Sequence, residues 1–226
     1  MKKELSYLLI MFGLIACGGG DENQENASQP HALALSASTH STSTDIQGIS
    51  DLQSGVYSIA LGHEDNLKVG TYYQSESNEK LLIINGNEQK SETIAYALAQ
   101  QPWRIINTSN DNPPIHINQY EKIKDELLDI SAFKGAYQST FNNIDIDMTI
   151  DGTGKVIAGQ SSCKLNGQIY QTPLANMVKY EINAHNCENI DALLQGYLVK
   201  DENYLPASFR LINLNQNILD LWFYES

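Results

Sequence analysis

The feature that most constrains the fold is a series of short alternating segments in the C-terminal half of this 226-residue chain. The clearest reads Ile144-Asp145-Ile146-Asp147-Met148-Thr149-Ile150-Asp151. It places its apolar side chains on one face and its aspartates on the other, with the two-residue period of a half-buried β-strand. Further strands are predicted near residues 155–159, 161–165, 168–170, 177–182, 195–199, 208–214 and 218–224. Such regular spacing favours a small antiparallel barrel or sandwich, because closing a sheet removes its exposed edges.

Turn signals separate these segments and support a mostly β, antiparallel meander. The dipeptides Asn85-Gly86, Asp151-Gly152 and Asn166-Gly167 predict tight hairpin turns, because these residue types tolerate a positive φ. In the N-terminal half, residues 93–98 alternate large with small side chains and are predicted to form a strand.

One short helix is expected between the two β regions. Asn118 precedes Glu121 with the spacing of a capping box, and apolar side chains recur at helical spacing at Tyr120, Ile123, Leu127 and Ile130. We therefore predict a linking helix from about Gln119 to Leu128.

The N-terminus has the pattern of an export signal. Lys2 and Lys3 precede an apolar run that ends at Ala16, which is shorter than the roughly 20 residues of a membrane-spanning helix. The run ends in Leu14-Ile15-Ala16-Cys17, which resembles the lipobox of bacterial lipoproteins. The resemblance implies a signal peptide over residues 1–16 and lipidation of Cys17, which anchors the chain in the bacterial envelope. Gly18, where retained lipoproteins have Asp, implies the outer membrane.

The composition divides the rest of the chain into segments. Residues 17–50 contain the lipidated cysteine and then mainly Gly, Ser, Thr, Asn, Gln and Glu, which predicts a disordered tether. We expect an N-terminal β subdomain over residues 51–117, the linking helix within 118–129, and a C-terminal barrel or sandwich over 130–226.

The cysteines bear on the C-terminal domain. If Cys17 carries lipid, Cys163 and Cys187 remain, and in an oxidising compartment they most simply form one disulfide. Free buried thiols or a metal site are the open alternatives. From about Gly135 to Tyr224 the chain looks like the small Gly- and Cys-containing, lipocalin-like β-barrels of uncharacterised lipoproteins. This resemblance implies a fold but no active-site residue.

Charge and motifs argue against several functions. The formal net charge of -13 makes a nucleic-acid partner improbable, because polyanions repel. The motif Asp147-x-Thr149-x-Asp151-Gly152 matches half of an EF-hand loop, but Ala158 stands where the bidentate Glu is needed. No Gly-x-Ser-x-Gly turn is present, and three histidines beyond the tether are isolated in sequence: His63, His116 and His185. We therefore predict no catalytic residue, metal ligand or cofactor.

These observations favour a non-catalytic lipoprotein of the outer membrane, anchored by its N-terminal lipid, whose β domain binds an envelope protein or a small apolar ligand. Most of the large aromatic residues are expected in the core, and a subset that lines a ligand pocket or a protein-binding patch is the alternative: Tyr72, Tyr73, Trp103, Tyr197, Tyr204, Trp222, Phe223 and Tyr224. Two alternatives stay open. One is an envelope hydrolase that uses scattered carboxylates or His185, and the other is an inhibitor or decoy that presents a loop braced by Cys163 and Cys187.

Overall fold

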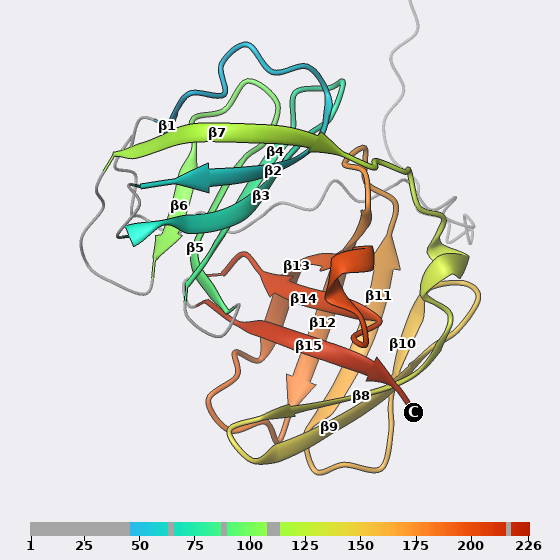
Figure 1. The fold of residues 1–226 in the computed structure, drawn as a ribbon. Coiled ribbons are helices and arrows are strands. Elements are labelled where there is room, and N and C mark those ends of the chain that lie inside the picture. Colours follow the sequence, from blue (N-terminus) through green and yellow to red (C-terminus); the bar gives the residue numbers. More distant parts are fainter. Residues whose placement is uncertain (1–45, 63–65, 87–89, 108–113, 216–217) are drawn as a thin grey trace, which may run out of the picture. The chain divides into compact units, whose positions relative to one another are not determined.

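The strands pair into a seven-stranded sheet and a closed eight-stranded barrel in this computed structural model (Figure 1). The structure describes residues 46–62, 66–86, 90–107, 114–215 and 218–226, all of which belong to one compact unit over residues 35–226. The predicted mostly β fold is confirmed, and the C-terminal region is a barrel rather than a sandwich.

The sheet has the order β1-β7-β2-β3-β4-β5-β6, and all of its neighbours are antiparallel except β1 and β7. The strand predicted over residues 93–98 is confirmed as part of β5. The bounds are β1 (Ile46–Gln47), β2 (Gly55–Leu61), β3 (Lys68–Gln74), β4 (Lys80–Asn85), β5 (Ser91–Ala97), β6 (Arg104–Asn107) and β7 (Ile115–Ile123).

The barrel is an antiparallel meander in which the last strand closes against the first. Short 3-10 turns precede it and interrupt it, at η3 (Ile130–Phe133) and η4 (Glu202–Tyr204). Its strands are β8 (Gly135–Phe141), β9 (Ile144–Ile150), β10 (Lys155–Ala158), β11 (Lys164–Tyr170), β12 (Met177–His185), β13 (Leu193–Val199), β14 (Phe209–Asn213) and β15 (Asp220–Glu225).

The predicted linking helix over residues 118–129 is wrong. Residues up to Ile123 belong to β7, which pairs with β2, and residues 124–129 form neither helix nor strand. The buried residues Ile115 and Ile117 begin this strand, and pairing with β2 continues it through the start of the predicted helix. The Nδ2 of Asn118 donates to the carbonyl of Gly62 at 2.7 Å, so this side chain fastens a loop instead of capping a helix.

Two of the three predicted turns lie at hairpins. Asn85-Gly86 ends β4, and Asp151-Gly152 joins β9 to β10, where the Asp151 amide donates to the carbonyl of Lys155. The turn predicted at Asn166-Gly167 is wrong, because both residues lie within β11. A Cβ on Gly167 would stand 2.1 Å from the Glu181 carbonyl oxygen of β12, so this glycine permits a close strand approach.

The predicted tether extends too far toward the C-terminus. Ile46 and Ile49 are buried in a core on one face of the sheet, so residues 46–50 are part of the fold. The remainder of the predicted tether, residues 17–45, lies outside the described residues.

The barrel interior is filled by its own side chains. Alternate residues point inward and are buried, as Ile146, Met148 and Ile150 show in β9, and they form one continuous cluster with the inward residues of the other strands. The interior of the barrel is therefore occupied by protein atoms and not by a large apolar cavity.

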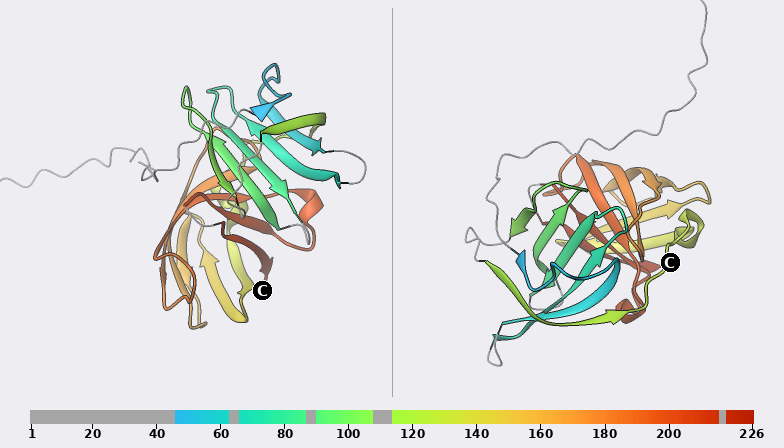
Figure 2. Two further views of the ribbon diagram at one scale, coloured as in Figure 1. Left: turned by 90° about the vertical axis from the view of Figure 1, so that its left-hand side faces the viewer. Right: turned by 90° about the horizontal axis from the view of Figure 1, so that it is seen from above.

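A second cluster joins the sheet to the outer wall of the barrel. Val56, Tyr73 and Leu81 of the sheet pack with Tyr197 of β13 and Ile212 of β14. This contact explains why β13 and β14 are buried on both faces. Figure 2 shows the cyan and green strands beside the orange and red strands of the barrel. Within the described part of the chain, no helix has the length and hydropathy of a membrane-spanning segment.

Candidate binding cleft

The barrel is incompletely paired where its last strand meets its first, and we call this junction the seam. In the described residues, β15 and β8 pair only at Tyr224↔Gln138 and Glu225↔Tyr137. The end of β15 lies beside the start of β8. From there the two strands separate, toward the start of β15 and the end of β8 (Figure 1). The barrel wall is therefore open over part of the seam.

A cleft of about 1140 Å³ lies at this opening, and we call it the seam cleft. Its walls come from β8, β9 and β15, from the loop after β10, and from the start of β5 in the sheet. It is lined by Lys90, Ser91, Gln138, Ser139, Thr140, Phe141, Asn142, Asp145, Ile146, Asp147, Gln160, Ser161, Ile218, Asp220, Leu221, Trp222 and Tyr224.

The floor of the cleft reaches residues that face the barrel interior. Ser139 and Leu221 are buried and alternate with outward-facing neighbours along their strands, yet both line the cleft because the strands separate there. Ser139 is only 6% exposed, and its hydroxyl has no hydrogen-bond partner among the residues that the structure describes. Its hydroxyl can therefore form a hydrogen bond with a group that enters the cleft.

One wall is fixed by a buried ion pair. The Arg210 guanidinium is fully buried and donates twice to Asp220, from Nε at 2.7 Å and from Nη2 at 2.5 Å. Arg210 Nη2 also donates to Ser91 Oγ at 2.9 Å, and the Ser91 amide donates to Asp220 at 2.7 Å. These bonds tie β14 and β15 of the barrel to β5 of the sheet.

The same arginine holds an aromatic side chain of the cleft in place. Its guanidinium lies 4.9 Å from the ring centroid of Trp222, and the ring of Tyr204 meets Trp222 edge-on at 4.8 Å. Burial opposes the charge of Arg210, but the hydrogen bonds and the negative charge of Asp220 outweigh it and raise the pKa of the guanidinium. Arg210 therefore stays charged, and Trp222 presents a fixed surface to the cleft.

The opposite wall is built around Asp147. Its carboxylate accepts the amides of Gln160 and Ser161, and its own amide donates to Ser161 Oγ at 3.1 Å. Hydrogen bonding to Ser161 lowers the pKa of Asp147, so the carboxylate is ionised at neutral pH. The loop after β10 is thereby fastened to β9.

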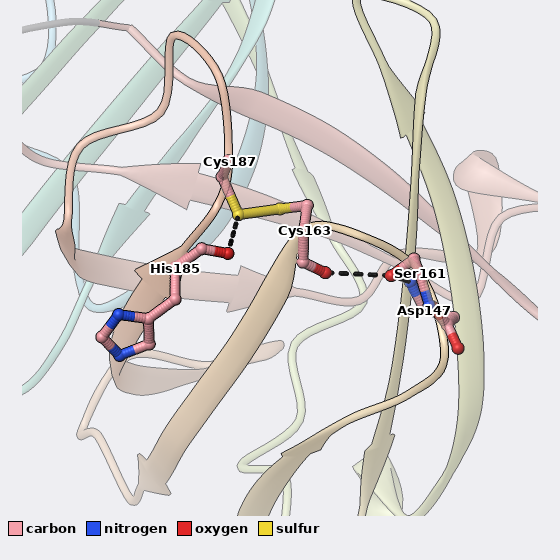
Figure 3. Close-up of a disulfide and its surroundings, with 5 residues drawn as sticks. All are labelled: Asp147, Ser161, Cys163, His185 and Cys187. Carbon is pink, nitrogen blue, oxygen red and sulfur yellow. Dashed lines mark hydrogen bonds between the residues drawn. A yellow bond between two sulfur atoms is a disulfide. The ribbon is translucent and has the colours of Figure 1, made fainter.

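A disulfide secures the end of that loop (Figure 3). Cys163 and Cys187 are joined with an S–S distance of 2.01 Å, as predicted, and not left as thiols or metal ligands. The hydroxyl of Ser161 donates to the Cys163 carbonyl at 2.9 Å, and Cys187 Sγ contacts the His185 carbonyl oxygen at 3.3 Å. The disulfide therefore connects the end of this loop to the residues that follow β12.

The other residues singled out in the sequence are not brought together. Cys17 and His63 lie outside the described residues, while His116 and His185 are exposed on β7 and β12. The carboxylate of Asp151 accepts hydrogen bonds within its own turn. Within the described residues, no group of three or more His, Cys, Asp or Glu could hold a metal ion.

Part of the aromatic set lines the cleft, and part lies in the cores. Trp222 and Tyr224 face it, whereas Tyr72, Tyr73 and Tyr197 are buried in the cores. The sequence prediction missed Arg210, although a lone arginine in the apolar run Phe209-Arg210-Leu211-Ile212 signals a buried partner.

The cleft offers carboxylates, hydroxyls, amides and an aromatic ring to a bound molecule. Comparisons of the chain with protein-family models, with curated proteins and with solved structures found no match. Only the sequence and the geometry of the seam cleft therefore bear on function.

Proposed function

We propose that the chain is a non-catalytic, lipid-anchored lipoprotein of the bacterial outer membrane that binds a protein partner in the seam cleft. The observation that carries the binding role is the large open cleft beside a filled barrel interior. An enclosed apolar cavity suits a small lipophilic ligand, but an open groove with polar walls suits a segment of another protein.

The rigidity of the walls supports the same role. The Arg210–Asp220 pair fixes one wall, and the disulfide and Asp147 fix the other. A site that is already ordered loses little conformational entropy when a partner binds.

The proposed location rests on the N-terminal sequence. The resemblance of residues 14–17 to a lipobox supports acylation of Cys17, and two or more acyl chains anchor a protein stably without a spanning segment. The partner is accordingly expected among proteins that meet the outer membrane. A mature chain that begins at Cys17 and carries the mass of its acyl chains is the expected product.

The binding role is tested by blocking the cleft. Thr140 is exposed on β8 and lines the cleft, so Thr140→Trp obstructs it without disturbing the core. Lys155→Trp on β10 is the matched control, because Lys155 is exposed and does not line the cleft. We expect the wild-type chain and Lys155→Trp to retain the same protein partner during gentle purification, as seen by native mass spectrometry, and Thr140→Trp to lose it. Equal retention by both variants would contradict the proposal.

A further inference from the structure

We propose that the seam cleft recognises its partner as an extended, lysine- or arginine-bearing segment whose backbone pairs with the open edges of β8 and β15. This inference rests on the proposed binding function and adds the mode of recognition and the chemistry of the partner.

Backbone groups at the seam point into the cleft. The Ser226 amide donates to the Ala136 carbonyl, and Tyr224 pairs with Gln138, so alternate residues of the two strands direct their N–H and C=O groups at each other. The next residues in this pattern are Trp222 and Thr140. They lie beyond the last registered pair between these strands, where the strands have separated and the cleft begins.

The other edges of these strands are already occupied. β8 pairs with β9 from Gly135↔Ile150 to Phe141↔Ile144, and β15 pairs with β14 from Phe209↔Phe223 to Ile212↔Asp220. Only the edges that face the cleft remain to receive another strand. Because β8 and β15 are antiparallel, an inserted segment would run parallel to one of them and antiparallel to the other, and such strand addition is an established mode of peptide recognition.

The floor of the cleft is compatible with an inserted strand. Alternate side chains of that strand would point inward, toward Ser139, which lines the cleft and whose hydroxyl has no partner among the described residues. A small or hydroxyl-bearing side chain fits there and satisfies the hydroxyl.

The outer face of the cleft selects a cation. On β9, Asp145 pairs with Thr140 of β8 and Asp147 pairs with Gln138. The two carboxylates therefore lie on the far side of β8 from the inserted segment, with one strand between. On the β15 side, the ring of Trp222 already holds Arg210, and Arg210 balances the charge of Asp220. A lysine or arginine on the outer face of the segment would lie near the Asp145 carboxylate, which favours a cation.

One cation of the protein also borders the cleft, because Lys90 extends from the sheet. The lining carboxylates outnumber it, and the chain has a formal net charge of -13. A basic segment therefore matches the cleft better than an acidic one, and its association should weaken as salt is added.

Amide hydrogen exchange of the mature chain carrying Cys17→Ser, followed by NMR, tests the pairing. The probe is an octapeptide in which Thr and Lys alternate. One control replaces Lys by Glu and tests the charge. The other keeps Thr and Lys but is N-methylated on alternate amides, and it tests the backbone pairing. In the protein alone, the amides of Thr140 and Trp222 should exchange at least ~10-fold faster than that of Tyr224. The lysine peptide should slow both at least ~10-fold, and neither control peptide should do so.

Two results would overturn the inference. If the lysine peptide shifts resonances of the cleft but leaves the Thr140 and Trp222 amides unprotected, strand addition is wrong. If it has no effect at about 1 mM, or the glutamate peptide acts equally, the basic segment is wrong. Asp145→Asn should weaken the lysine peptide about tenfold, whereas Glu188→Gln, an exposed carboxylate outside the cleft, should not.

These failures are distinguishable from failure of the proposed function. If Thr140→Trp loses the natural partner while the peptide gives no protection, the cleft binds a protein by another mode. If Thr140→Trp and Lys155→Trp retain the partner equally, the cleft is not the binding site.

Discussion

Arg210 stands in β14 between Phe209 and the apolar pair Leu211 and Ile212, and its guanidinium is completely buried. Its partners come from two regions far apart in sequence. Asp220 is ten residues away, and Ser91 is 119 residues away. The residue therefore links the sheet, the barrel and one wall of the cleft.

We predict that Arg210→Met destabilises the fold by about 3–5 kcal/mol, because it leaves the buried Asp220 carboxylate without its counterion. The measurement is the free energy of urea unfolding. The double variant Arg210→Met with Asp220→Leu should recover part of the loss, since no buried charge then lacks a partner. A single variant within about 1 kcal/mol of the wild type would contradict the assigned role.

At the scale of the element, alternation located most of the barrel. The strand predicted at residues 144–151 is β9, and every later predicted strand overlaps a strand of the barrel. The prediction of a helix near Gln119 is wrong. Apolar residues three and four positions apart do not exclude a strand here, because β7 is buried only at its start. Pairing with β2, a contact about 60 residues away in sequence, decided between the two structures.

The dipeptide at Asn166-Gly167 shows how a local signal can have a non-local cause. Its glycine is required by the backbone of β12 and not by a turn. We predict that Gly167→Ala costs about 1–3 kcal/mol, because its Cβ would stand 2.1 Å from the Glu181 carbonyl oxygen.

The matched control for this substitution is Gly152→Ala at the real hairpin turn. A Cβ there would meet its nearest atom, in the side chain of Lys134, at 3.9 Å. Thermal unfolding should place Gly152→Ala near the wild type and Gly167→Ala well below it. The reverse order would contradict the close approach assigned to Gly167.

At the scale of the whole molecule, the sheet and the barrel share a core and an ion-paired contact. The sequence could indicate two β regions, but not that one would cover the outer wall of the other. The seam cleft was also beyond prediction, because it depends on where the closing strands separate, and neither β8 nor β15 carries a signal of that separation. Only its aromatic residues could be suspected.

We predict that the two parts unfold together, because separating them exposes the apolar outer faces of β13 and β14. The two tryptophans report each part separately, Trp103 beside the sheet core and Trp222 in the barrel. In Trp222→Phe the remaining tryptophan reports on the sheet, and in Trp103→Phe it reports on the barrel. In each variant the fluorescence transition should coincide with the circular dichroism transition. A fluorescence midpoint separated from it would show that the two parts unfold independently.

The central claim is that a protein partner occupies the seam cleft, and site-specific photocrosslinking in cells tests it most directly. A photoreactive residue at Thr140 lies in the cleft, whereas one at Lys155 lies on the barrel surface outside it. We predict one discrete protein adduct from position 140 and none from position 155. Adducts of equal yield from both positions, or none from position 140, would contradict the claim.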